Sequence, residues 1–206
     1  ERYELYTERV RAIAYFGSRS LIDLYGGDWD RYPSPLGIRD LVRYPRQVFR
    51  EGAARVGREL MVRRSVREIA NAYRGVCKSK YETLSRYHFA ICYENARLDG
   101  FMIEKLFDCL LVGTIPVYLG DPGVASRVPE DCFIDRRRFS DYRALREYMS
   151  TLAADDIERH RKAGRKFLES DRFVPFSKHQ FARRFVSDAL SVFEGITHVP
   201  SGQHGG

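Results

Sequence analysis

The 206-residue sequence lacks most of the short motifs from which a function can be read directly. It has no G-x-G-x-x-G and no G-x-x-x-x-G-K-[ST], which excludes the common dinucleotide fingerprint and the P-loop. Its four cysteines are widely separated and form no C-x-x-C pair, and its five histidines are scattered, so no zinc-binding spacing is present. We therefore expect free thiols and a reducing compartment, the cytoplasm.

Long apolar runs and low-complexity tracts are also missing. No apolar run reaches the roughly 18 residues that a membrane-spanning helix needs. Only residues 199–206 are so poor in apolar side chains that we expect a disordered tail. Hydrophobic residues make up 44% of the chain, with 13 Tyr and 13 Phe. A chain of this length and composition can form a core without a disulfide or a metal.

Basic residues exceed acidic ones by 35 to 28, a formal charge of +7 that favours anionic partners. The most basic stretch is 39–74. Arginines at helical spacing are typical of a solvated helix face, and the alternative is a surface for peripheral membrane contact or for an anion. No nucleic-acid-binding motif is present, so we expect no nucleic acid as a partner and rank a nucleic-acid-binding module as the least favoured alternative.

Helical and strand patterns alternate along the chain. Such alternation predicts βαβ units, hence a Rossmann-like parallel sheet with helices on both faces. Ligands of such sheets bind where the strands end, which draws attention to the loops that begin at Tyr93 and Gly120. The expected helices are 3–16, 44–61, 80–87 and 101–113, followed by two or three more up to residue 193; the expected strands are 21–25, 88–94, 114–120 and 132–135.

The strand expected at 88–94 runs into a loop with Glu94 and Asn95, and the next helix carries Glu104 and Lys105 near its start. A helix N-terminus offers free N–H groups and a partial positive charge, and Lys105 adds a full charge beside it. A diphosphate fits this pattern. The alternative is that the adjacent Glu-Lys pair is ordinary helix surface.

The segment 87–139 resembles the donor-site region of the α-1,3/1,4-fucosyltransferases. That family has a strand ending in F-E-N, a helix start Y-x-T-E-K, a V-P-V-x-x-G strand and P-x-x-x-F-I. The flanks 4–16, 22–29 and 167–185 resemble bacterial members, so the likeness extends from about 4 to 193. The matching residues are Tyr93-Glu94-Asn95, Phe101 to Lys105, Ile115-Pro116-Val117 with Gly120, and Pro129 with Phe133-Ile134.

This resemblance implies that residues 1–198 are the donor-binding, C-terminal half of a GT-B glycosyltransferase. The donor would be GDP-β-L-fucose, and fucose would pass with inversion to a hydroxyl of an N-acetylglucosamine or glucose unit through an α-1,3 or α-1,4 linkage. The alternative is a GT-B transferase that uses another nucleotide sugar. Because the first residue is Glu1 rather than Met, we expect the N-terminal acceptor domain to belong to a longer protein.

The resemblance also implies roles for single residues. Lys105 and Arg9 match the cations that hold the diphosphate, and Glu104 matches the carboxylate beside the fucose ring, so these three are the candidate catalytic residues. Asn95 and Phe101 match donor contacts, although Phe101 stands where the family has Tyr. Ile103 likewise replaces Thr. Nearby Lys80 is a further candidate for the diphosphate.

Three further expectations complete this interpretation. With Arg and Lys at the leaving group, no metal is obligatory, and Mn²⁺ is at most an activator. An inverting transfer needs a general base, and the resemblance implies that this base lies in the acceptor domain. Glu94 is not the candidate, because it matches a glutamate with a structural role. The resemblance places the protein in glycan biosynthesis and protein glycosylation, in the cytoplasm with peripheral membrane contact, or in the Golgi lumen if the source is eukaryotic.

Overall fold

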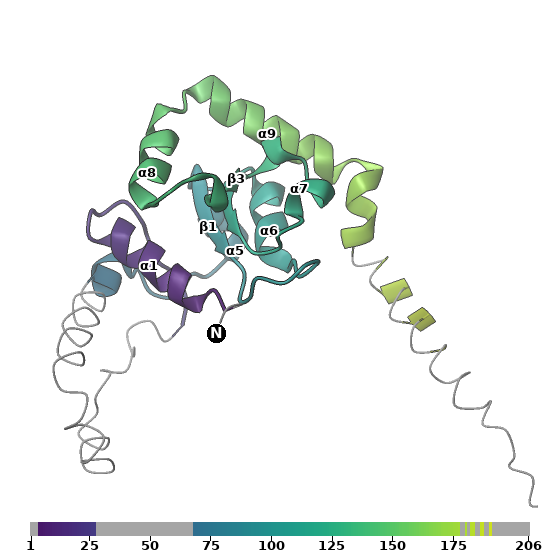
Figure 1. Ribbon diagram of the computed structural model, residues 1–206, viewed down its shortest axis with the longest axis horizontal. Coiled ribbons are helices and arrows are strands. Elements are labelled where there is room, and N and C mark those ends of the chain that lie inside the picture. Colours follow the sequence, from purple (N-terminus) through teal and green to yellow (C-terminus); the bar gives the residue numbers. More distant parts are fainter. Residues whose placement is uncertain are drawn as a thin grey trace, which may run out of the picture.

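The computed structural model describes residues 4–27 and 68–177, together with 180, 182, 183, 186, 187 and 190. The helix expected at 44–61, most of the basic stretch 39–74 and the tail 199–206 lie outside the described residues. In chain order the elements are α1 (Tyr6–Gly17), α5 (Lys80–Leu84), β1 (Phe89–Tyr93), α6 (Glu104–Val112), β2 (Ile115–Leu119), α7 (Val124–Arg127), the 3₁₀ turn η2 (Glu130–Cys132), β3 (Ile134–Asp135), η3 (Arg136–Arg138), α8 (Tyr142–Thr151), α9 (Ala154–Leu168) and η4 (Asp171–Phe176) (Figure 1).

The three strands form one parallel sheet in the order β1-β2-β3. β1 and β2 pair from Phe89↔Ile115 to Tyr93↔Leu119, and Val117 of β2 pairs with Ile134 of β3. Helix α6 connects the first pair of strands, and α7 with η2 connects the second pair. All three strands therefore end at the same edge of the sheet.

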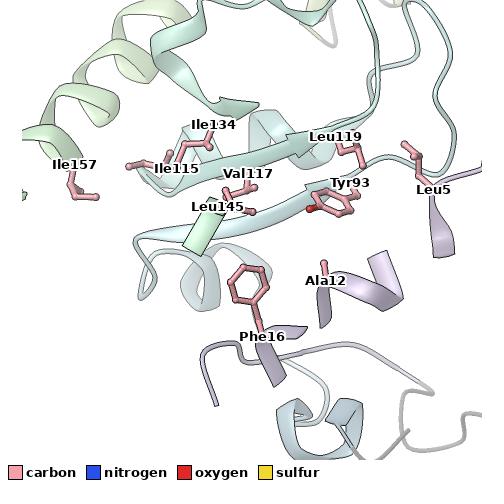
Figure 2. Close-up of a cluster of buried hydrophobic side chains, with 10 residues drawn as sticks. All are labelled: Leu5, Ala12, Phe16, Tyr93, Ile115, Val117, Leu119, Ile134, Leu145 and Ile157. Atoms are coloured by element: carbon pink, nitrogen blue, oxygen red, sulfur yellow. The ribbon is translucent and has the colours of Figure 1, made fainter. Parts of the chain in front are cut away.

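Helices cover both faces of this sheet. Residues Ile115, Val117 and Leu119 of β2 pack on the face that α1 and α8 cover, as Figure 2 shows for Phe16 and Ala12 of α1 beside the strands. Alternate strand side chains point the other way, as expected for the period of two in a strand. On that second face the cluster is formed with α6 and α9 and includes Cys92, Leu106, Cys109, Tyr118, Phe133 and Phe167. The predicted Rossmann-like α/β fold is confirmed.

The local sequence explains the central elements. Every residue of β2 is buried, in keeping with an unbroken apolar run in a strand covered on both faces. Helix α6 ends at Gly113, which has a φ of 75° that suits glycine, and its N–H closes the helix on Cys109. The helix expected at 101–113 ends at Gly113, as predicted. It begins at Glu104, three residues later than predicted.

Two expected strands differ from the structure. Residues 21–25 form no strand, because only Leu24 pairs, in an isolated parallel bridge with Tyr73. The chain around Tyr73 offers no strand to pair with, because residues 68–72 before it are helical and Gly75 after it turns with a φ of 86°. The 132–135 strand shortens to β3, because η2 takes up the residues before Phe133.

Candidate functional site

The candidate site lies at the carboxyl edge of the sheet, where β1 and β2 pass into the segments 94–103 and 120–123. The two strand ends stay joined, since the Glu94 N–H donates to the Leu119 carbonyl over 2.8 Å. Side chains from α1 and α6 converge on this edge. Parallel sheets bind ligands at this position because the strand ends expose unpaired backbone beside helix N-termini.

Arg9 reaches the edge from α1, far away in the sequence. Its Nη2 donates to the carbonyls of Tyr93 (2.8 Å) and Glu94 (3.2 Å) and to Oδ1 of Asn95 (3.0 Å). The guanidinium also lies over the Tyr6 ring, 5.1 Å from its centroid. Within the described part of the chain, its Nε and Nη1 have no hydrogen-bond acceptor, so they remain available to an anion.

Lys105 reaches the same point from the first turn of α6. Its Nζ lies 3.3 Å from Oδ1 of Asn95 and 3.4 Å from Oε2 of Glu94. Both distances are long for hydrogen bonds, so these contacts are weak ones that an incoming anion can replace. Arg9 and Lys105 thus share one amide oxygen, and the structure brings together three of the predicted site residues.

Glu94 supports this cluster from inside the protein. Its side chain is fully buried, and its Oε1 accepts the N–H of Ile103 over 3.0 Å. Burial raises the pKa of the Glu94 carboxyl, although the Ile103 N–H and Lys105 oppose the rise. The expectation of a buried, structural Glu94 is confirmed.

The start of α6 is open. Its N-cap residue is Ile103, whose side chain makes no capping hydrogen bond. The N–H groups of 104–106 have no partner within the helix, as in the first turn of any α-helix, and the Ile103 side chain supplies none. Together with the partial positive charge of the helix, they favour an anion next to Lys105.

Glu104 of α6 and Lys80 of α5 belong to a second group of charged side chains, together with Asp108 of α6. The Lys80 ammonium pairs with Asp108, a buried carboxylate that also accepts the Tyr81 hydroxyl over 3.1 Å. It lies 3.8 Å from Glu104, whose side chain is more than half exposed. Lys80 thus fastens α5 to α6 and sits beside Glu104 instead of joining the Arg9–Lys105 cluster. Its contact with a diphosphate stays a prediction.

Phe101 is half-buried in the segment that joins β1 to α6. A residue that the sequence interpretation missed holds this segment: Asp121, which accepts the Gly100 N–H over 3.1 Å. Asp121 is fully buried and pairs with Arg127 over 2.9 Å. The sequence did offer a signal for Asp121, because it follows Gly120 in the loop after β2, and ligands of parallel sheets bind in such loops.

The arrangement suits a phosphate-bearing ligand. Two cations and an uncapped helix N-terminus meet at one strand end, and their charges are fixed before a ligand arrives. Such preorganised charge stabilises negative charge that develops on a leaving diphosphate. Fold and site together describe an α/β domain with a basic cluster at the carboxyl edge of its sheet.

The comparisons place this domain in a family. The family model described as glycosyltransferase family 10 (fucosyltransferase), C-terminal part, matches residues 59–163, just over half of the chain. The chain therefore belongs to this family, and the predicted kinship with fucosyltransferases is confirmed. Among the described residues, no helix is long and apolar enough to cross a membrane.

The similar proteins share only part of their length with this chain. An alpha-(1,3)-fucosyltransferase FucT of Helicobacter pylori is 35% identical over 75 residues, which is 36% of this chain and 16% of that protein. A GDP-fucose protein O-fucosyltransferase 3 of Gallus gallus is 35% identical over 79 residues, 38% of this chain and 17% of that protein. A crystal structure of alpha1,3-fucosyltransferase with GDP is 30% identical, covers 48% of this chain and 27% of that one, and has a TM-score of 0.37.

Proposed function

We propose that this chain is the donor-binding part of an inverting fucosyltransferase that takes GDP-β-L-fucose. The observation that carries the proposal is the convergence of Arg9 and Lys105 on Asn95 at the open start of α6. Family membership supports the fucosyl donor, and the basic cluster supports its diphosphate.

Each residue has a chemical task in this proposal. Departure of GDP leaves negative charge on the β-phosphate, and Lys105 and Arg9 stabilise that charge where it forms. The fucosyl carbon gains positive character, which a carboxylate beside the ring offsets, as in glycoside hydrolysis. Glu104 supplies that carboxylate, and Lys80 at 3.8 Å holds it without burying it. Asn95 and Phe101 contact the donor.

The acceptor in this proposal is a hydroxyl of an N-acetylglucosamine or glucose unit of a glycan, joined through an α-1,3 or α-1,4 linkage. The H. pylori relative, an alpha-(1,3)-fucosyltransferase by name, supports this choice. The name of the Gallus gallus relative points instead to a protein hydroxyl. Transfer assays on N-acetyllactosamine and on a serine- or threonine-containing peptide distinguish the two.

No obligatory metal enters this proposal, because Arg9 and Lys105 supply the positive charge at the leaving group. The sequence does contain one D-x-D arrangement, Asp28-Trp29-Asp30, which lies outside the described residues. Aspartates in that spacing can hold a divalent cation with a diphosphate. We expect GDP to bind equally well in EDTA and in Mn²⁺, and a strict need for Mn²⁺ would assign the diphosphate to a metal.

The decisive experiment is differential scanning fluorimetry of the chain with GDP, UDP and ADP. A ligand at 100 times its dissociation constant stabilises the fold by about 2.7 kcal/mol, which raises the melting temperature by roughly 5–10 °C for a chain of this size. We expect that shift with GDP and a smaller one with UDP and ADP. Equal shifts would favour a different nucleotide sugar, and no shift with any nucleotide would contradict a donor site.

The cellular setting belongs to the same proposal. The excess of basic residues supports peripheral contact with an anionic membrane through 39–74, most of which lies outside the described residues. A cytoplasmic location fits free cysteines, and all four are unpaired by disulfides. Flotation of the chain with phosphatidylserine vesicles, compared with neutral vesicles, tests the membrane contact.

A further inference from the structure

Two fully buried carboxylates stand at the ends of neighbouring strands. Glu94 follows β1, and Asp121 follows β2. Each accepts one backbone N–H from the segment that joins β1 to α6: Glu94 from Ile103 over 3.0 Å, and Asp121 from Gly100 over 3.1 Å. Each also faces one cation. The segment is therefore attached at two points, and Phe101 lies between them.

Asp121 is held rigidly by its own surroundings. Its Oδ1 also accepts the Gly123 N–H over 2.8 Å, and its Oδ2 accepts Nη1 of Arg127 over 2.9 Å. Its own N–H donates to the Tyr118 hydroxyl over 3.0 Å. The carboxylate thus cannot follow the segment if the segment moves. A buried charge with this many donors is an anchor, because removing it would leave the donors without a partner.

The segment needs such an anchor. Gly100 has a φ of 72°, and its carbonyl accepts the N–H of Met102 over 3.1 Å, so the chain turns sharply just before α6. The Phe101 N–H closes a second tight turn on the Leu98 carbonyl over 3.2 Å. Local turns of this kind leave the direction of the whole segment open. The hydrogen bond from Gly100 to Asp121 fixes that direction relative to β2.

We propose that Asp121 is a positioning residue for the donor: it holds Gly100 in place and thereby sets the position of Phe101 and of the first turn of α6. The inference rests on the proposed function, since Phe101 and Lys105 are its donor contacts. Arg127 neutralises the buried carboxylate. It also reaches Asp99 over 3.3 Å, an outer contact at an exposed side chain.

That outer contact provides a matched control. Asp121→Ala removes the acceptor of Gly100, whereas Asp121→Asn keeps an oxygen that can accept both glycine N–H groups. Asp99→Asn removes the other carboxylate that pairs with Arg127 and leaves the hydrogen bond from Gly100 to Asp121 in place. Amide hydrogen exchange over 97–103 without nucleotide and the GDP dissociation constant are measured for each, at a temperature where circular dichroism shows the variant to be folded.

We expect faster exchange over 97–103 and about tenfold weaker GDP binding for Asp121→Ala, the effect of losing one well-made hydrogen bond to a charged group. Asp121→Asn should keep most of the affinity, and Asp99→Asn should match the unchanged chain in both measurements. A residue that only stabilises the fold would lower the melting temperature and leave the GDP affinity of the folded protein unchanged. Should Asp121→Ala not fold, Asp121→Ser replaces it, because its shorter side chain does not reach Gly100.

The outcomes separate this inference from the function on which it rests. If the unchanged chain binds GDP and folded Asp121→Ala binds it equally well, the positioning role is wrong and the donor site stands. If the unchanged chain binds no GDP, the proposed function fails and the positioning role fails with it. Faster exchange together with weaker binding, both restored by asparagine, supports the inference.

Discussion

At the scale of single residues, Asn95 organises the candidate site. Its Oδ1 accepts from both Arg9 and Lys105, so two side chains of like charge are held close together before any ligand is present. Buried Glu94 offsets part of their repulsion through its carboxylate, 3.4 Å from Lys105. A diphosphate would relieve the rest. The charge arrangement therefore favours an anionic ligand over a neutral one.

Replacing Lys105 tests this account directly. We expect Lys105→Ala to weaken GDP binding by about 1.5–3 kcal/mol, the range for a hydrogen bond to a charged group. Lys162→Ala is the control, because it removes the same charge from an exposed position on α9. Calorimetry with GDP measures both. Equal affinities for the two variants would remove Lys105 from the phosphate site.

Gly120 is a second residue with a sharp consequence. A Cβ at this position would lie 2.4 Å from Cγ of Glu94 and 2.5 Å from the Tyr118 hydroxyl. Neither buried side chain has room to move, so Gly120→Ala should lower the free energy of unfolding by about 1–3 kcal/mol. Gly27→Ala is the matched change, since no described residue other than its chain neighbours lies within 4 Å of an added Cβ. Urea unfolding of both variants checks this, and a fully stable Gly120→Ala would mean that the strand end is loosely packed.

At the scale of elements, α1 decides whether Arg9 reaches the site. Its start is tied to the end of β1 by the Leu5 N–H, which donates to the Asn95 carbonyl over 3.0 Å. Its first turn is also tied to α8, where the Tyr142 hydroxyl donates to the Glu8 carbonyl (3.0 Å) and to the Glu8 carboxylate (2.8 Å). The helix thus carries Arg9 into place through contacts on both sides.

Loss of one hydroxyl should loosen this attachment. We expect Tyr142→Phe to reduce stability by about 0.5–1.5 kcal/mol, the usual net contribution of a hydrogen bond, with a lower melting temperature as the readout. Tyr148→Phe on the same helix is the control, because its ring packs on Phe139 and no described residue bonds its hydroxyl. If both variants have the melting temperature of the unchanged chain, the contact from α8 to α1 contributes nothing to stability.

The elements also show what the sequence could and could not predict. The apolar run of β2 and the glycine end of α6 are local signals, and both elements lie where they were expected. The strand expected at 21–25 failed because strand formation depends on a partner that local sequence does not specify. Ligands of parallel sheets bind where the strands end, and this rule drew attention to the loop with Asn95 and to Lys105 in the helix that follows. The role of Arg9 at the same site was implied only by the family resemblance. The position of Asp121 after a strand was a usable signal, but its contact with Gly100 joins two loops, and the local sequence does not specify which loop residues meet.

At the scale of the whole molecule, the family match includes most of the strand edge on which the proposed donor site lies. The family model spans β1, β2 and α6 with Asn95 and Lys105, whereas α1 with Arg9 precedes the matched residues. The aligned part of the chain covers only 16–17% of the two named relatives. The proposed donor binding is therefore the part of the function that is tested first on this chain.

The last prediction separates binding from catalysis. An inverting transfer needs a base that takes the proton of the acceptor hydroxyl. In the proposed function neither carboxylate next to Lys105 is this base, because buried Glu94 already accepts the Ile103 N–H and Glu104 stands beside the fucose ring. We therefore expect the 206-residue chain to bind GDP in calorimetry but to transfer no radiolabelled fucose from GDP-fucose to N-acetyllactosamine. Lys105→Ala serves as the control for specific binding. Measurable transfer by the unchanged chain would show that a base lies within these residues, and Glu104 would then be the first to replace with Gln.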